Sequence, residues 1–317
     1  MRWPGSERMS ASNEILTTRV VCTTETASKA LTRSIRAYVV LLKPEITFMV
    51  MISTAVASLL APGSVSFVVL FHSVIGTGLL AAGASSLNQY FERDLDSRMR
   101  RTASRPLPAG ELTARQAFVF GVAVAICGML YVLFTLNRLT ALLGLLTLIS
   151  YLFVYTPLKT KTRLSTFVGA FPGATPVLIG WSAATNNLSL EAWSLYAILF
   201  LWQFPHFYAI GWLYREDYAR AGMLMLPTAD QNGGRTTFRF ILISTQLLII
   251  ASLLFTFFAH SKEFYLAFAI ILGSCFYYFA YQLSRSQSKL GAKRVLHASV
   301  IYLPLLYLFM LIDRINL

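Results

Sequence analysis

Three side chains that carry oxygen ligands recur at four-residue steps around residue 90. They are Asn88, Glu92 and Asp96. Residues four apart lie on one face of an α-helix, so the three would form a single stripe. A dense run of arginines that includes Arg101 and Arg105 follows directly. Proteins hold Mg²⁺ with one or two carboxylates plus substrate phosphates, and arginine forks bind phosphate oxygens, so the segment fits a metal–diphosphate ligand better than a lone cation or anion.

Two other segments carry polar groups of the same kinds. One contains Asp217 within an Arg-Glu-Asp-Tyr run, and the other contains Tyr155, Lys159 and Lys161. Taken singly, the basic residues are also explained as ordinary solvated loop charges. The acidic residues are less easily explained in this way, because membrane topology selects basic loop residues and does not require acids. We therefore expect the three segments to lie together at one face of the molecule.

The composition excludes a soluble protein. Hydrophobic residues make up 56% of the 317 residues and charged residues only 13%, against roughly 25% charged in soluble domains. A chain this apolar cannot bury its hydrophobic surface in one or two aqueous cores, and it is too hydrophobic to be disordered. The three cysteines are far apart and show no C-x-x-C spacing, so neither a disulfide framework nor a thiolate metal site is indicated.

Long apolar runs predict an all-α integral membrane protein. A membrane helix needs about 20 mostly apolar residues, and these runs lack the alternation of a barrel strand. The second and sixth runs are each followed by an acidic segment, which hints at two related four-helix halves in a ring-like bundle around a central cavity. Nine runs are predicted to span the membrane: 38–61, 66–90, 115–136, 138–157, 164–184, 190–213, 238–259, 264–283 and 295–312.

Basic residues are distributed unevenly between the loops that these spans create. Of the 27 Lys and Arg residues, all but Arg138, Lys262 and Arg314 fall on the side of the N-terminus. The positive-inside rule then places the N-terminus in the cytoplasm, and it accounts for most of the net charge without a nucleic-acid partner. Residues 1–35 are predicted to form a polar, disordered tail and residues 36–317 a single transmembrane domain. Acids in the tail favour a bacterial inner (plasma) membrane over the mitochondrial inner membrane.

The chemistry-bearing segments resemble motifs of the intramembrane aromatic prenyltransferase superfamily over about residues 36–312. The stripe of Asn88, Glu92 and Asp96 matches its first motif, although many relatives carry Asp where Glu92 stands, and the run Arg101–Pro108 continues the match. Within the superfamily, two pieces are similar to the protohaem IX farnesyltransferase (haem O synthase) branch. They are Asp217–Pro227, with the pattern D-Y-x-x-A-G-x-x-M-L-P, and Trp202–Phe207, with the pattern W-Q-F-P-H-F.

The resemblance implies transfer of the farnesyl group of farnesyl diphosphate to a vinyl group of haem B, which yields haem O. It implies Mg²⁺ as the cofactor, haem B as a substrate, and a membrane-lipid environment. A haem A synthase or an oxidase assembly factor would be a partner. The implied metal ligands are Asn88, Glu92, Asp96 and Asp217. The residues implied at the diphosphate are Arg101, Arg105, Lys159 and Lys161.

Several residues and functions keep a second interpretation. His206, inside a predicted span, is either a haem contact or iron ligand, or a hydrogen-bonded structural histidine. Tyr155 either stabilises an allyl cation through its ring or is an ordinary interfacial tyrosine. Lys43 is expected to extend to the cytoplasmic surface, with a haem propionate as the alternative. The competing functions are prenyl transfer to a quinone precursor or other aromatic acceptor, transport, and non-catalytic haem binding.

Overall fold

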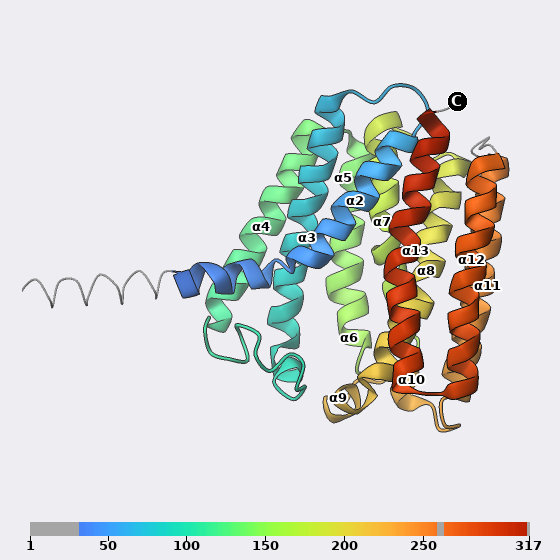
Figure 1. Ribbon diagram of the computed structural model, residues 1–317. Coiled ribbons are helices and arrows are strands. Elements are labelled where there is room, and N and C mark those ends of the chain that lie inside the picture. The colour runs from blue at the N-terminus through green and yellow to red at the C-terminus, as the bar shows by residue number, and fades with distance from the viewer. Residues whose placement is uncertain (1–31, 259–262, 316–317) are drawn as a thin grey trace, which may run out of the picture.

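The computed structural model describes residues 32–258 and 263–315, and every regular element in this part of the chain is a helix (Figure 1). Two short helices, α9 (Arg215–Arg220) and α10 (Leu226–Ala229), lie in a loop, and η1 (Ser150–Tyr155) with α6 (Thr156–Leu158) continues α5. The long helices are α2 (Pro44–Leu60), α3 (Phe67–Asp96), α4 (Ala114–Thr135), α5 (Arg138–Ile149), α7 (Ser165–Thr185), α8 (Leu190–Leu213), α11 (Arg235–Phe258), α12 (Glu263–Ser286) and α13 (Lys289–Ile315).

These helices confirm the predicted all-α membrane class. Seven are long and apolar enough to cross a membrane, and an eighth candidate is the bent pair Thr32–Leu41 and α2. α8 has 24 residues but is not among these candidates, and it carries Gln203 and His206 in its second half. Large apolar side chains such as Phe67 and Phe134 are exposed on the outside of the bundle, as expected for contact with lipid. Nine spans and a cytoplasmic N-terminus stay predictions.

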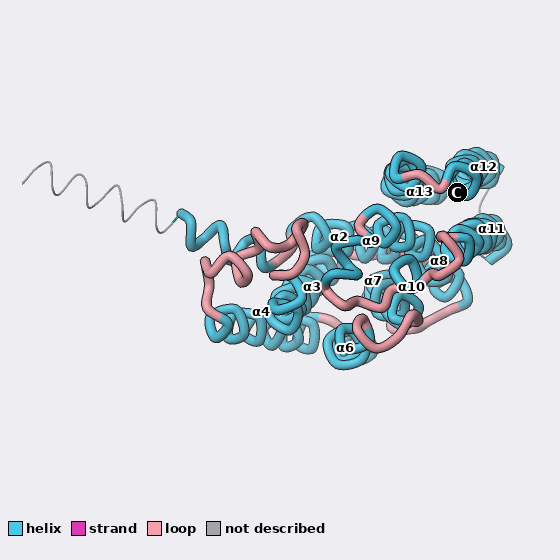
Figure 2. Tube along the Cα trace, turned by 90° about the horizontal axis from the view of Figure 1, so that it is seen from below, coloured by secondary structure: helices cyan, strands magenta, loops and turns pink. Residues whose placement is uncertain are grey.

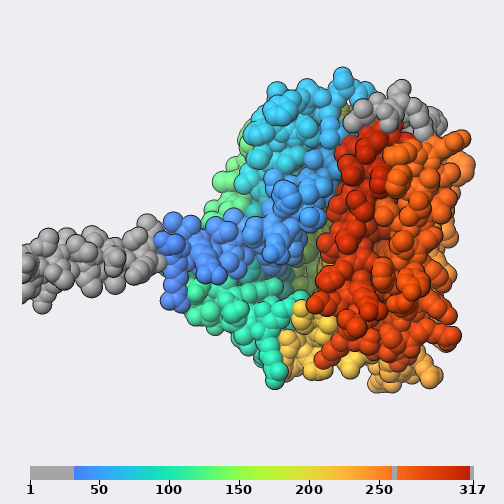
Figure 3. All heavy atoms as spheres, viewed as in Figure 1, coloured from blue at the N-terminus to red at the C-terminus, as the bar shows by residue number. Residues whose placement is uncertain are grey.

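Helices that follow one another in the chain are neighbours, and the last returns to the first. α13 lies against α2 (Figure 3), where the Tyr307 hydroxyl is 3.4 Å from Ser53 Oγ and the Arg314 guanidinium donates to the Ala61 carbonyl at 3.2 Å. α7 packs against α2 and α8, and also contacts α3 and α5. The helix ends in Figure 2 show α2 to α4 towards one side and α11 to α13 towards the other. Because successive helices are in contact and α13 also contacts α2, the arrangement fits a ring-like bundle. The central cavity stays a prediction.

The first predicted span, 38–61, is not one straight helix. The helix Thr32–Leu41 meets α2 at an angle of 47°. At the junction, Lys43 adopts a left-handed backbone conformation with φ 47°, and Pro44 begins α2. Proline has no N–H for the preceding turn and disfavours a helical conformation in the residue before it, so the helix cannot continue through this pair. Of the predicted tail 1–35, residues 1–31 lie outside the described residues.

The second span is longer than predicted, and its extension positions the first acidic motif. α3 begins at the Ser66 cap, whose hydroxyl accepts the Val69 N–H at 3.2 Å, and continues without a break to Asp96. The loops 97–113, 159–164 and 214–234 all lie at this end of the bundle (Figure 1, bottom). We call it the basic end, because these loops carry nine basic residues: Arg98, Arg100, Arg101, Arg105, Lys159, Lys161, Arg163, Arg215 and Arg220.

Candidate active site

The polar stripe of α3 faces the protein interior. Asn88 is 1% exposed, Glu92 5% and Asp96 1%. A buried carboxylate is costly unless it is paired or hydrogen-bonded, so each of these side chains needs a partner from another segment. The sequence predicted the stripe from spacing alone, and the structure shows that all three members point inward from one helix.

Glu92 is paired with Lys159 from the loop after α6. The Lys159 Nζ donates to Glu92 Oε1 at 2.5 Å and lies 4.6 Å from the centroid of the Tyr155 ring. Burial lowers the pKa of Lys159, but the Glu92 carboxylate together with Tyr155 and Tyr151 outweighs burial and holds this pKa above its usual value. Lys159 therefore stays charged, which places a fixed cation beside the carboxylate stripe and an aromatic ring.

A π-helical turn presents Tyr155 towards this cation. In η1 the Thr156 N–H bonds to the carbonyl of Tyr151, five residues back, and the Thr156 hydroxyl donates to the same carbonyl at 2.8 Å. The next residue is Pro157, which has no N–H to continue the regular pattern. The Thr156 hydroxyl also accepts from the Asn88 amide at 3.3 Å, which ties the turn to α3. Such π turns are frequent at functional sites.

The Tyr155 ring lies directly against the backbone of α7. A Cβ added at Gly169 would lie 2.4 Å from the Tyr155 ring. We predict that Gly169→Ala forces the ring away from Lys159, lowers turnover about tenfold and costs about 1–3 kcal/mol of stability, as other overpacked sites do. Thermal unfolding in detergent and the initial rate would measure both effects. In a Tyr155→Leu background the same change should cost much less, and equal costs in the two backgrounds would contradict the proposed steric clash.

Asp96 keeps one carboxylate oxygen without a partner. Its Oδ2 accepts from the Arg105 guanidinium at 2.7 Å, while its buried Oδ1 has no hydrogen-bond partner among the described residues. An unpaired carboxylate oxygen is the donor that Mg²⁺ prefers. The described residues contain no group of three His, Cys, Asp or Glu side chains that could hold a metal by themselves. The donors present thus fit an ion that is held jointly with phosphates rather than in a complete protein cage.

Lys43 belongs to the same cluster, although we expected it to extend to the surface. Its Nζ donates to Asn88 Oδ1 at 2.9 Å, and it experiences the charges of Glu92, Asp96 and Lys159. The left-handed break before Pro44 is what directs the side chain inward instead of along the helix. A Lys-Pro pair inside an apolar run was the sequence signal for this break, but spacing alone did not reveal the partner.

We predict that Lys43→Met raises the KM for the anionic substrate about tenfold or more, because a charge-assisted hydrogen bond inside the site is worth about 1.5–3 kcal/mol. Steady-state rates at varied prenyl diphosphate concentration would measure the effect. The matched control is Lys293→Met, at an exposed position of α13, which should leave KM unchanged. An unaltered KM in Lys43→Met would remove this residue from the site.

Asp217 lies beside the arginine run that follows α3. The Arg101 backbone N–H donates to Asp217 Oδ2 at 3.4 Å, and the carboxylate forms an ion pair with Arg220. The Arg101 guanidinium donates to the Tyr218 hydroxyl at 2.8 Å and lies 4.8 Å from the Tyr214 ring centroid. The roles of Arg220 and the two tyrosines were missed in the sequence, because nothing in their local spacing indicates contacts with a loop more than 100 residues earlier.

The three polar loops are held together by backbone contacts and a small apolar cluster. The Leu224 N–H donates to the Lys159 carbonyl at 2.8 Å, and the Arg220 guanidinium donates to the Arg98 carbonyl at 3.2 Å. Met99 packs in a buried apolar cluster with Tyr218 of α9 and with Ala221, Met223 and Met225 of the loop that follows. The expected gathering of the three segments at one face is therefore what the structure shows.

Two predicted residues lie apart from this cluster. Lys161 is exposed, and no carboxylate among the described residues pairs with it. His206 lies on α8, and its Nδ1 is 2.8 Å from Ser299 Oγ on α13. Their predicted roles at the diphosphate and the haem stay predictions.

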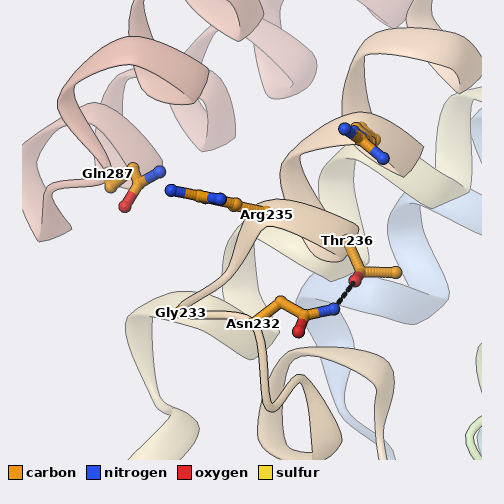
Figure 4. A pocket seen from close by; sticks show the side chains of 6 residues that line it. Asn232, Gly233, Arg235, Thr236 and Gln287 are labelled. Carbon is orange, nitrogen blue, oxygen red and sulfur yellow. Dashed lines mark hydrogen bonds between the residues drawn. The ribbon is translucent and has the colours of Figure 1, made fainter.

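A separate pocket opens near the start of α11. It has a volume of about 530 Å³ and is lined by Asn232, Gly233, Arg235, Thr236, Arg239 and Gln287 (Figure 4). Within this lining, the Asn232 amide donates to the Thr236 hydroxyl at 3.4 Å. None of these residues belongs to the carboxylate cluster, so we do not include this pocket in the candidate site.

Comparison with known proteins identifies close relatives in sequence. Residues 50–306 match the UbiA prenyltransferase family. The protoheme IX farnesyltransferase of Solibacter usitatus is 46% identical over 289 residues, which cover 88% of this chain and 99% of that protein. The protoheme IX farnesyltransferase of Koribacter versatilis is 42% identical over 252 residues, covering 77% of this chain and 81% of that protein.

Solved structures share the fold. The structure titled as that of a digeranylgeranylglyceryl phosphate synthase in membranes superimposes with a TM-score of 0.74 at 18% identity and covers 90% of this chain and 99% of its own. A UbiA homolog from Archaeoglobus fulgidus, bound to DMAPP and Mg²⁺, gives a TM-score of 0.66 at 15% identity and covers 88% and 99% of the two chains. At these identities the likeness concerns the fold alone.

Proposed function

Since this chain belongs to the UbiA prenyltransferase family, we propose that it transfers the farnesyl group of farnesyl diphosphate to a vinyl group of haem B and so makes haem O. The observation that carries the proposal is the buried stripe of Asn88, Glu92 and Asp96. Each of its members contacts a basic side chain from another segment: Lys43, Lys159 and Arg105, respectively. The two relatives named protoheme IX farnesyltransferase, which this chain matches over 99% and 81% of their lengths, support haem B as the acceptor.

Mg²⁺ is the metal that suits this site. Asp96, through its unpartnered Oδ1, would hold it together with Glu92, Asn88 and Asp217. When bound, Mg²⁺ would supply positive charge that stabilises the leaving diphosphate. The solved homolog that carries both DMAPP and Mg²⁺ supports the pairing of a metal with a prenyl diphosphate in this fold.

The diphosphate would be bound by the basic side chains around the stripe. Arg105 and Lys159 already lie 2.7 and 2.5 Å from carboxylates, so their charges are fixed at the mouth of the site. Lys43 and Arg101 would add two more cations, and the exposed Lys161 would contact an arriving anion. Breaking the allylic carbon–oxygen bond moves negative charge onto the leaving group, and preorganised cations stabilise that charge.

The farnesyl chain would extend into the apolar bundle, where each buried methylene contributes about 0.8 kcal/mol to binding. Loss of diphosphate leaves an allyl cation, which the face of the Tyr155 ring stabilises. The haem vinyl group attacks this cation, and addition of water to the resulting cation, with loss of one proton, gives a hydroxyethylfarnesyl group. Lys159 would act on the leaving group directly, Glu92 would act on it through the Mg²⁺ that it helps to hold, and Tyr155 would act on the cation.

The proposal is tested with purified full-length protein, haem B, farnesyl diphosphate and Mg²⁺. We expect haem O to accumulate, as detected by mass spectrometry, and to be absent when Mg²⁺ is chelated. A parallel reaction with 4-hydroxybenzoate in place of haem B should give no prenylated product. If the protein prenylates the quinone precursor instead, or binds haem without forming haem O, the assigned reaction is wrong.

The proposed synthesis of haem O also suggests the membrane in which the protein lies and the proteins with which it interacts. A bacterial inner membrane supplies both the lipid environment and haem B, and the charged tail is compatible with it. A haem A synthase, which would use the product, or a terminal oxidase assembly factor would be the partner. Cross-linking in intact membranes would identify such a partner.

A further inference from the structure

A second polar cluster lies between α8 and α13, away from the carboxylate stripe. The Trp202 indole N–H donates to the Ser299 carbonyl at 2.8 Å, and the Trp202 ring stacks on the His206 ring with centroids 4.6 Å apart. The Ser299 hydroxyl, in turn, lies 2.8 Å from His206 Nδ1. One residue of α13 therefore positions both aromatic rings of α8.

The contacts of Ser299 determine which nitrogen of His206 carries the proton. The Ser299 hydroxyl has a single proton, and it lies 2.7 Å from the Leu296 carbonyl in the donor geometry that helical serines commonly adopt. The hydroxyl must then accept from His206, so Nδ1 carries the hydrogen. If Nδ1 were unprotonated, the single Ser299 proton could serve only one of its two neighbours, His206 Nδ1 or the Leu296 carbonyl. In the other contact two lone pairs would face each other. The Nδ1–H form satisfies both, and it leaves a lone pair on Nε2.

His206 Nε2 is free to bind a ligand. None of the described residues forms a hydrogen bond with it, and the side chain is only half-buried. His206 lies seven residues before the end of α8, which is about 10 Å from the basic end at 1.5 Å per residue. A neutral imidazole with Nδ1–H bonded to an oxygen and Nε2 unprotonated is the form in which histidine ligates a metal.

We propose that Ser299 fixes the tautomer of His206 so that Nε2 binds the iron of the haem substrate. Ser299 is then a positioning residue, because it acts through His206 and does not touch the iron. Trp202 completes the arrangement by holding the imidazole plane through stacking. The inference rests on the proposed function, because that function supplies haem B as the ligand.

Titration of the purified full-length protein with ferric haem B, followed by absorption and resonance Raman spectra, tests this assignment. Wild type should show an iron–histidine signature. His206→Ala should lose that signature and bind haem about a hundredfold more weakly, and added imidazole should restore the spectrum. Ser299→Ala should keep the ligand but weaken binding about tenfold and shift the iron–nitrogen stretch. Ser299→Thr, which retains the hydroxyl, should resemble wild type.

His72 provides a matched control, because its Nδ1 also bonds to a hydroxyl, that of Tyr131, at 2.7 Å. His72→Ala should leave the haem spectrum unchanged. A wild-type spectrum in His206→Ala, or an equal loss in His72→Ala, would overturn the assignment of the iron ligand. A normal iron–nitrogen stretch in Ser299→Ala would overturn the role of the hydroxyl. Haem O formation by wild type is measured separately, so failure of the proposed reaction is distinguishable from failure of this inference.

Discussion

Replacing Asp96 by asparagine is expected to lower the rate of farnesyl transfer about 10²–10³-fold while haem binding stays intact. The substitution conserves size but removes the negative charge and replaces one oxygen of the carboxylate by an amide that cannot ligate Mg²⁺ through nitrogen. Asp96 is 1% exposed, and its Oδ1 has no hydrogen-bond partner among the described residues, so bulk water has little access to replace the lost ligand. Asp217→Asn is expected to follow the same pattern, with a smaller loss because Asp217 is more exposed.

The measurement is the initial rate of haem O formation at several Mg²⁺ concentrations, with a haem titration alongside. Asp94→Asn is the matched control, because Asp94 lies on the same helix with its side chain 76% exposed and, among the described residues, forms an ion pair only with Arg93 at 3.8 Å. It should retain wild-type activity. Full activity of Asp96→Asn at low Mg²⁺ would show that the α3 stripe is not the metal site.

Replacing Lys159 by methionine is expected to abolish turnover and to lower the free energy of unfolding by about 3–5 kcal/mol. Removing one member of a buried ion pair leaves the other charge uncompensated, and Glu92 is 5% exposed. Lys159 also contacts the Tyr155 ring and accepts, through its carbonyl, the N–H of Leu224. Only the side-chain contacts are lost on substitution, so the loops should stay in place.

A double-mutant cycle separates the two roles of Lys159. Lys159→Met combined with Glu92→Gln removes both charges and should recover most of the lost stability, but it should remain inactive because the cation for the diphosphate is still missing. Arg163→Ala, at an exposed position of the same loop, should be stable and active. Recovery of turnover in the double variant would mean that Lys159 only neutralises Glu92.

Much of the architecture was predictable, because a membrane imposes simple rules on a chain. Apolar length identified the helices, including α8, and the four-residue spacing of Asn88, Glu92 and Asp96 correctly predicted that the three residues form one stripe. The family predicted from the motifs is confirmed by the match of residues 50–306. Local periodicity is sufficient for such inferences, because residues close in sequence on one helix have fixed relative positions.

The boundaries were less accurate where local chemistry breaks a helix or extends it. The predicted first span ran through residue 43, but Lys43 and Pro44 divide it into two helices at 47°. The second predicted span ended at residue 90, whereas α3 continues to Asp96. Apolar length measures the part of a helix inside the membrane, and it contains no information on how far the helix extends beyond it.

The sequence by itself determined an all-helical membrane protein, the single stripe formed by Asn88, Glu92 and Asp96, and the superfamily to which the chain belongs. Only the tertiary structure decided which cation meets which carboxylate, that Lys43 points at Asn88, and that Ser299 meets His206 from 93 positions further along the chain. The physical reason is that side chains on one helix are related by a fixed periodicity, whereas partners on different helices are chosen by packing over the whole bundle.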